Sequence, residues 1–242
     1  MNSEYMKDLF GKAILDFQTN TSPEAITTET NISEADEMDV AYLFRNYKEM
    51  PNTEKKALQL CKGKILDVGC GAGSHSLYLQ EEGFDVTSID ISENAIKACS
   101  LRGLKNLKVQ NLLDLDSESN HDKFDTILLL MNGTGIFETI DETSKYLQKL
   151  KSLLTDDGQI LIDSSDIIYM YDEDEDGSYS VPADNYYGEL TFTIHYKNQT
   201  EENFPWLYLD YNTLQNACHE NGLQCELVLE GNHFDYLAKL TV

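Results

Sequence analysis

The stretch Lys64-Ile-Leu-Asp-Val-Gly-Cys-Gly-Ala-Gly-Ser-His-Ser76 predicts more of the fold than any other part of the chain. Its first five residues, 64–68, are a short apolar run of the kind that forms a buried strand. Three closely spaced glycines then indicate a turn, and a helix is expected over 74–82. A second expected strand, 85–90, ends in Ile89-Asp90. A strand, glycine turn, helix and second strand in this order are typical of a pocket for a ligand that contains adenosine.

The spacing of the glycines narrows the kind of ligand. They fall at positions 69, 71 and 73, which gives the pattern G-x-G-x-G. A dinucleotide-binding turn has the pattern G-x-G-x-x-G, and its third glycine would stand where this chain has Ser74. Gly69 and Gly71 allow backbone angles that side chains forbid, so the main chain can lie against a ligand. Gly73 is expected to let the helix pack close to its strand.

Asp90 is the expected ribose ligand. It stands at the carboxyl end of the second strand, where its carboxylate can accept hydrogen bonds from both ribose hydroxyls of an adenosine. Ile91 then offers an apolar face to the adenine ring. The first amides of the helix point into the turn and favour a carboxylate or another polar group. The alternative interpretation is that the glycines form only an ordinary tight turn.

Expected strands and helices alternate from residue 64 onward. The expected strand 124–131 contains the continuous apolar run 127–131, as expected for a strand that is covered on both faces of a sheet. This alternation predicts an α/β fold with a doubly wound, mostly parallel sheet. The expected strands are 64–68, 85–90, 107–110, 124–131, 159–163, 225–230 and 234–242; the expected helices are 74–82, one that Ser92 caps, 139–154 and 212–221.

Two regions depart from this alternation. Residues 1–60 are expected to form an N-terminal helical cap and linker before the domain at 61–242. The cap would contain an amphipathic helix from Met6 to Phe17, a polar and mobile link over 19–39, an aromatic segment at 40–47 and a helix at 53–61. An acidic and then tyrosine-rich insertion at about 165–210 is expected to form a β-hairpin lid, with strands at 189–197 and 206–211.

The composition limits the partners of the protein. A formal net charge of −25 repels phosphate backbones and anionic membranes, so nucleic acid and membrane partners are not expected. No apolar run approaches the ~20 residues that span a bilayer, and the first residues do not resemble a signal peptide. The five cysteines show no C-x-x-C spacing, which favours reduced thiols in the cytoplasm. No metal site is expected, because the acidic run 172–176 is better interpreted as an exposed loop.

With Asp67 directly before the glycine turn, the quoted stretch resembles motif I of the class I S-adenosylmethionine (SAM)-dependent methyltransferases. The resemblance covers residues 60–165 well and the closing helix and hairpin more loosely. It implies a seven-stranded Rossmann-like sheet whose last strand, 234–242, is antiparallel. It also implies SAM as the cofactor and a small molecule as the methyl acceptor.

The resemblance implies roles for the positions that match the family. Asp67 and the backbone from Gly69 to Gly73, Cys70 and Gly71 included, would hold the methionine part of SAM, and Asp90 would hold the ribose. The stretch that ends at Leu115 would lie near the adenine, where Asn111 or Asp114 is available. We prefer Asp114 because a carboxylate is the better acceptor. Met131 and Asn132 would line the methyl-transfer site.

A likeness to a bacterial subgroup of these enzymes adds two residues. This subgroup has a YLFR-like segment before motif I and an LLLMNG-like fourth strand. By this likeness Tyr42 and Arg45 would cover the cofactor, with Arg45 near its carboxylate. The alternative is that Tyr42 belongs to the core and Arg45 forms a surface ion pair.

The sequence identifies no catalytic residue, because methyl transfer from a sulfonium depends largely on positioning. If the acceptor needs a general base, the candidates are Asp166, His195 and His233, although a helix cap explains Asp166 better and ordinary strand-face positions explain the two histidines better. An aromatic group is expected to line an acceptor pocket or else to pack the hairpin: Tyr169, Tyr171, Tyr186, Tyr187 and Trp206. The alternatives to a methyltransferase are a SAM-binding protein without transferase activity and, less favoured, a nicotinamide-dependent oxidoreductase.

Overall fold

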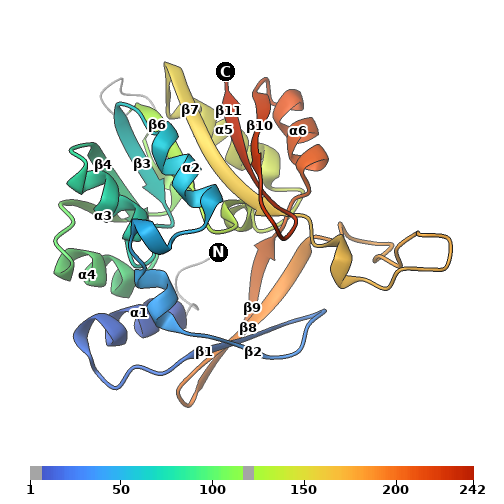
Figure 1. Cartoon of the computed structure of the whole chain (residues 1–242), viewed down its shortest axis with the longest axis horizontal. Coiled ribbons are helices and arrows are strands. Elements are labelled where there is room, and N and C mark those ends of the chain that lie inside the picture. The colour runs from blue at the N-terminus through green and yellow to red at the C-terminus, as the bar shows by residue number, and fades with distance from the viewer. Residues whose placement is uncertain (1–6, 117–122) are drawn as a thin grey trace.

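The computed structural model describes residues 7–116 and 123–242. Across these described residues, the main sheet has seven strands in the order β10-β11-β7-β6-β3-β4-β5 (Figure 1). Strands β5, β4, β3, β6 and β7 are parallel, and the last strand β11 runs antiparallel to both β7 and β10. The predicted doubly wound sheet with an antiparallel last strand is therefore confirmed. The strand bounds are β3 Lys64–Val68, β4 Asp85–Asp90, β5 Asn106–Val109, β6 Phe124–Leu129, β7 Leu154–Ser165, β10 Gln224–Glu230 and β11 Asp235–Thr241.

Helices cover both faces of this sheet, which explains why successive residues of its central strand β6 are apolar over 127–129. On β6, Ile127 and Leu129 pack on the face covered by α5, whereas Leu128 packs on the face covered by α2 and α3. All three side chains are fully buried. The helices of the domain are α2 Asn52–Leu60, α3 Ser74–Glu81, α4 Glu93–Leu101, α5 Thr143–Ser152 and α6 Tyr211–Glu220.

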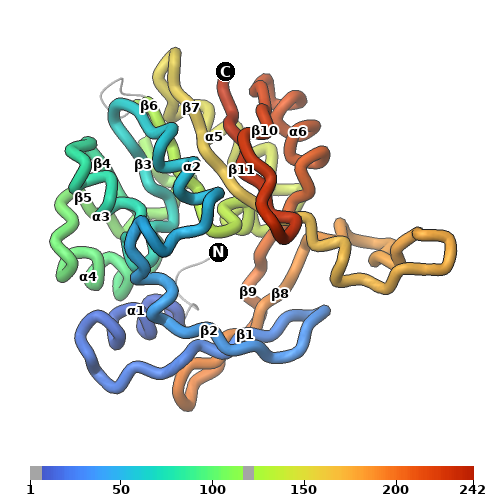
Figure 2. The backbone as a smooth tube through the Cα atoms, viewed as in Figure 1, coloured from blue at the N-terminus to red at the C-terminus, as the bar shows by residue number. Residues whose placement is uncertain are grey.

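A second, antiparallel sheet has four strands within the described residues, in the order β2-β1-β8-β9. Its strands are β1 Ile26–Thr30, β2 Asp36–Met38, β8 Glu189–Tyr196 and β9 Gln199–Leu207. Helix α1, Leu9–Thr19, packs on its inner face against Ile26, Ile194 and Tyr196. The backbone trace in Figure 2 shows segments from the N-terminus and from the insertion side by side in this sheet. Met6, the predicted start of the first helix, lies outside the described residues.

The expectation of a mobile link over 19–39 is wrong, because β1 and β2 occupy much of it. Strand β1 pairs with β8, with Thr27 opposite His195 and Thr30 opposite Phe192. The segment is polar and lacks an amphipathic pattern, so the pairing depends on a strand far away in the sequence. Strand β9 also begins earlier than the predicted strand at 206–211.

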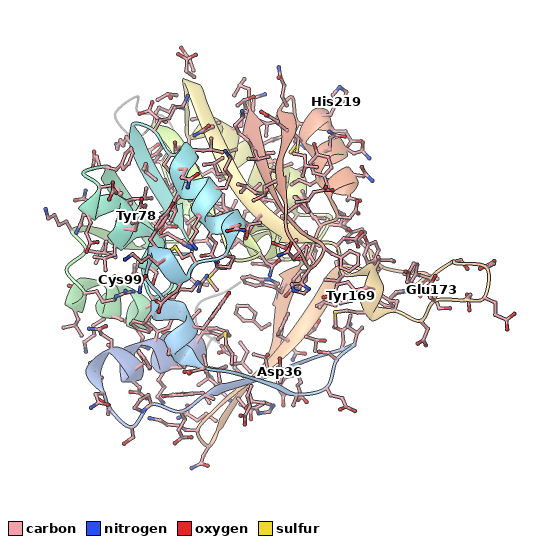
Figure 3. The ribbon with its side chains drawn as sticks, in the orientation of Figure 1. Asp36, Tyr78, Cys99, Tyr169, Glu173 and His219 are labelled. Atoms are coloured by element: carbon pink, nitrogen blue, oxygen red, sulfur yellow. The ribbon has the colours of Figure 1, made fainter. Side chains whose placement is uncertain are left out.

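Residues 168–187 form an arm that projects from the body of the molecule (Figure 2). A short 3-10 helix, η6 Ile168–Met170, begins it. Figure 3 shows Tyr169 near its base and Glu173 farther out, and residues 172–176 are exposed, as predicted. Tyrosine hydroxyls fasten the base of the arm, with Tyr187 donating to Asp166 (2.8 Å) and Tyr171 donating to the Tyr187 carbonyl (2.7 Å).

Within residues 7–116 and 123–242, no helix has the length and apolar character needed to cross a bilayer.

Candidate active site

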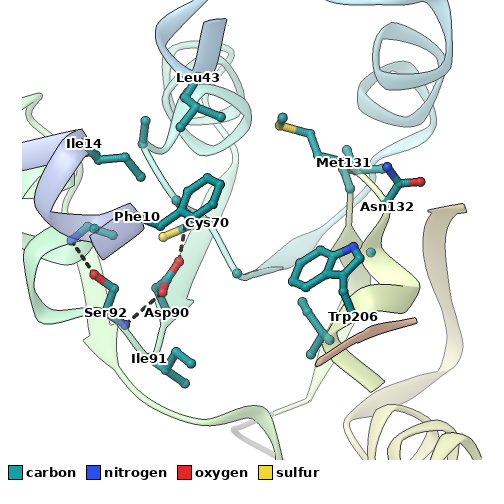
Figure 4. Close-up of a pocket in the computed structure, with 18 of the residues that line it drawn as sticks. Phe10, Ile14, Leu43, Cys70, Asp90, Ile91, Ser92, Met131, Asn132 and Trp206 are labelled. Carbon is teal, nitrogen blue, oxygen red and sulfur yellow. Dashed lines mark hydrogen bonds between the residues drawn. The ribbon is translucent and has the colours of Figure 1, made fainter. Parts of the chain in front are cut away.

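A cavity of ≈ 430 Å³ opens at the carboxyl ends of β3, β4 and β6, where the order of the strands reverses. Helix α1 and the small sheet form its opposite wall. A smaller cavity of ≈ 100 Å³ adjoins it. Asp90 and Trp206 line both cavities, and Figure 4 shows them facing each other across the open space. Because the two cavities share lining residues, they are treated as two parts of one site.

The glycine turn brings bare backbone to the larger cavity. Gly71 has φ +53°, and a Cβ at this position would meet only Ile14 Cδ1, at 4.0 Å. Its outer surface is therefore open to a ligand. Gly73, with φ +78°, differs from the expectation: a Cβ there would meet Leu104 Cδ1 at 2.5 Å and Cys99 Sγ at 2.8 Å. Gly73 thus allows α3 to pack against α4 and the loop after it rather than against β3.

Asp90 is held in one orientation by backbone amides. Its Oδ2 accepts a hydrogen bond from Gly71 N and its Oδ1 from Ser92 N, both at 2.9 Å. Burial raises the pKa of this carboxyl, although the two amides act in the opposite direction. Because each oxygen keeps a further acceptor position, the carboxylate can receive two hydroxyl groups. Its neighbour Ile91 is partly exposed and also lines both cavities.

A chain of buried charged side chains adjoins the glycine turn, on α2, β3 and the first turn of α3. Asp67 Oδ2 accepts from Ser76 Oγ at 2.5 Å, and His75 Nε2 lies 2.6 Å from Glu54 Oε2. Glu54 also forms a buried ion pair with Arg45. Asp67, His75 and Arg45 line the larger cavity. The sequence reasoning missed His75 and Glu54, although His75 stands in the first turn of the helix that the glycine motif predicts.

The charge states of this chain follow from its contacts. Burial lowers the pKa of His75, but its hydrogen bond to the Glu54 carboxylate and the charge of Asp67 outweigh burial, so the pKa is raised. For Glu54, burial acts to raise the pKa, but His75 and Arg45 lower it overall. Burial raises the pKa of Asp67, partly offset by His75 and Ser76. A cationic His75 between two carboxyls is the arrangement that these shifts favour.

Arg45 carries a buried donor without a partner among the described residues. Its Nη1 donates to the Tyr42 carbonyl at 2.6 Å and its Nη2 faces Glu54, but Nε makes no hydrogen bond. Arg45 lines the larger cavity, and its guanidinium cation fits an anionic ligand group there, for instance a carboxylate. Tyr42 lies under the guanidinium, 4.0 Å from ring centroid to Cζ. It is 46% exposed and lines neither cavity, so the expectation that it covers the cofactor is not supported.

The turn after β6 has an unusual backbone. Met131 and Asn132 have φ values of +68° and +59°, which non-glycine residues rarely adopt. Asp163, at the end of β7, holds this turn by accepting from Met131 N (3.1 Å) and Gly133 N (3.0 Å). Burial raises the pKa of Asp163 to about 6, although the two amides oppose the shift. Met131 and Asn132 line the larger cavity, as the family likeness implies for its methyl-transfer site.

The residues expected near an adenine divide into two groups. Asn111 lines the smaller cavity, and its Oδ1 accepts from Leu113 N at 2.9 Å. Asp114 is exposed and Leu115 packs against the core, and neither lines a cavity. The preference for Asp114 over Asn111 is therefore not supported by the structure. Cys70 lines the larger cavity, 4.0 Å from Cys99 between sulfur atoms.

None of the three candidate bases lines either cavity. Asp166 accepts from Ile168 N at 2.9 Å and from the Tyr187 hydroxyl at 2.8 Å, whereas Ile167 occupies the cap position of η6. His195 lies on β8, where its ring nitrogens face Thr200 and Glu29. His233 is exposed in the turn before β11. These positions do not support a catalytic role.

The wall formed by the small sheet and α1 is mainly aromatic and apolar. Of the predicted aromatic group, Trp206 lines the cavities, whereas the four tyrosines line neither. A carboxylate from this wall, Glu201, is buried and accepts from Lys7 N (2.7 Å) and Leu9 N (3.1 Å), which ties β9 to the start of α1. The apolar residues of this wall are Phe10, Met38, Phe192, Ile194, Phe204 and Trp206, with Tyr208 beside them.

The seven-stranded sheet and a glycine turn facing an acidic strand end define a nucleoside-binding class I methyltransferase fold. A family described as a methyltransferase domain matches residues 61–236, and the chain belongs to that family. It is a SAM-dependent methyltransferase.

Solved and curated relatives agree with this assignment. A SAM-dependent methyltransferase from Bacteroides fragilis, solved in complex with S-adenosyl-L-homocysteine, is 44% identical, with a TM-score of 0.88 over 98% of this chain and 95% of that one. An uncharacterized methyltransferase of Staphylococcus carnosus is 26% identical over 201 residues, covering 82% of this chain and 86% of that protein. A protein named as a methyltransferase from Geobacillus is 31% identical over 105 residues, so this match spans 41% of either protein.

Proposed function

We propose that the protein transfers the methyl group of SAM to a small molecule that binds in the larger cavity. The observation that carries this proposal is the cavity of ≈ 430 Å³ between the carboxyl edge of the main sheet and the wall made by the small sheet and α1. Volumes of about 300–1,000 Å³ with a mostly apolar lining are typical of small-molecule sites.

The cofactor is assigned to the junction of the two cavities. Asp90 and Ile91 would hold the adenosine, with Asn111 at the adenine end in the smaller cavity. Asp67 and the backbone of the glycine turn would hold the amino-acid part. The guanidinium cation of Arg45, which lines the larger cavity, supports a place for the cofactor carboxylate at this end. Bound SAM supplies an activated methyl group, so the protein residues contribute mainly by orienting the two ligands.

Charge and cysteine chemistry support the remaining parts of the proposal. A net charge of −25 disfavours a nucleic-acid acceptor. Cys61, Cys70, Cys99 and Cys218 are buried free thiols, which supports a cytoplasmic location.

The test is a transfer assay with tritiated SAM and three acceptor fractions from a bacterial extract: small metabolites, protein and RNA. We expect the label to appear in the metabolite fraction. The matched control is Gly71→Val, whose side chain would enter the cavity at a residue with φ +53° and should abolish transfer. Label confined to protein or RNA would contradict the proposal.

A further inference from the structure

Trp206 occupies a special place in the site. It comes from β9, in the inserted lid, yet it lines both the larger and the smaller cavity. Gly69 and Asp90, from the cofactor motif, line both cavities with it. With Phe204 of the same strand, which also lines both cavities, Trp206 places the lid at the boundary between the two parts of the site.

The indole ring is fixed in this position by close packing. A Cβ at residue 135 would lie 1.9 Å from Trp206 Cε2, so the ring can pack here only because that residue is glycine. Phe204 stacks against the indole, with ring centroids 5.9 Å apart and planes at 25°. Figure 4 shows the indole across the cavity from Asp90 and Phe10, with Met131 on its own side. A ring held in this way presents the same surface to every ligand.

The position of this surface relative to the cofactor follows from the proposed function, on which this inference rests. The ribose is assigned to Asp90 and the amino-acid part to Asp67, and the sulfur atom of the cofactor connects these two parts. The sulfur must therefore lie between Asp90, which lines both cavities, and Asp67, which lines the larger one, and Trp206 lines that same larger cavity. In SAM this sulfur is a sulfonium cation, whereas in the product S-adenosyl-L-homocysteine it is a neutral thioether. Aromatic faces, and indole most strongly, attract cations.

We propose that Trp206 recognises the positive charge of the SAM sulfonium and so lets the protein distinguish the methyl donor from its demethylated product. Because the residue belongs to the lid, the same contact links donor binding to the acceptor side of the cavity. After transfer the attraction is lost, which favours release of the product.

The test is calorimetric measurement of the dissociation constants of SAM and S-adenosyl-L-homocysteine without an acceptor, for the unaltered protein, Trp206→Phe and Trp206→Leu. We expect Trp206→Leu to weaken the binding of SAM about three- to tenfold more than the binding of S-adenosyl-L-homocysteine. Trp206→Phe should retain most of the difference in affinity between the two ligands. The matched control is Tyr179→Leu, an exposed aromatic residue of the arm that lines neither cavity.

Intrinsic fluorescence gives a second readout, because Trp206 is the only tryptophan in the sequence. We expect both ligands to change its emission, and SAM to change it more. An equal loss of affinity for both ligands in Trp206→Leu, or emission that neither ligand alters, would overturn the inference while leaving the cofactor assignment intact. Failure of the unaltered protein to bind either ligand would instead overturn the proposed function, and the inference with it.

Discussion

Replacement of Asp90 by asparagine should weaken cofactor binding without unfolding the protein. Each oxygen of the carboxylate accepts one hydrogen bond from a backbone amide, of Gly71 or Ser92, and keeps a further acceptor position. Asparagine preserves the shape but removes the charge and one acceptor oxygen. A hydrogen bond to a charged group contributes about 1.5–3 kcal/mol, so the dissociation constant should rise about 10- to 150-fold. The lower part of this range is more realistic, because Asp90 is only partly buried.

The assay is calorimetric titration of Asp90→Asn with S-adenosyl-L-homocysteine, together with thermal unfolding to show that the fold is retained. The matched control is Asp85→Asn, at the opposite, exposed end of the same strand. It should bind like the unaltered protein. A folded Asp90→Asn variant whose affinity stays within about twofold of the unaltered protein would refute the ribose assignment.

Three other substitutions test separate parts of the site. The pKa of Asp163 is raised from 3.8 to about 6, so its ionisation opposes folding, and the free energy of unfolding should fall by at most about 3 kcal/mol as pH rises from about 4 to about 6. Asp163→Asn should flatten this pH dependence in urea unfolding at a series of pH values. An unchanged pH dependence would contradict the raised pKa. Gly73→Ala should lower the free energy of unfolding by about 1–3 kcal/mol, because its Cβ would meet Leu104 and Cys99; an unchanged urea midpoint would contradict that packing argument. Arg45→Lys should weaken the binding of S-adenosyl-L-homocysteine about five- to tenfold in calorimetry, but it should leave the affinity for 5′-methylthioadenosine, which lacks the carboxylate, unchanged. An equal loss of affinity for both ligands would place Arg45 away from the cofactor carboxylate.

The main sheet and one end of the site are predictable from sequence because their signals are local. The glycine spacing, the apolar run before it and the acid at Asp90 all fall within one short stretch, and the structure brings Gly71 and Asp90 into direct hydrogen-bond contact. The continuous apolar run of β6 likewise predicts a strand that is covered on both faces. Such features depend on the backbone requirements of one turn and on burial, which neighbouring residues largely determine.

The other wall of the site is not predictable in this way. Strand β1 is polar, and only its pairing with β8, more than 160 residues later, orders it. The partners Glu54 and Arg45 are likewise brought to His75 by the packing of separate elements. Asp163 is visible in the sequence only as the acid near the end of a strand, and its contacts with the strained turn after β6 arise in the sheet itself. Tertiary pairing, rather than local pattern, therefore determines the lid and the buried charges.

The central claim is that the paired cavities at the carboxyl edge of the sheet bind SAM rather than a dinucleotide. Calorimetric titration of the unaltered protein with S-adenosyl-L-homocysteine, and separately with NAD, tests it most directly. We predict one binding site with an affinity of about micromolar order for the first ligand and no heat of binding for the second. Binding of NAD, or no binding of S-adenosyl-L-homocysteine, would contradict the account.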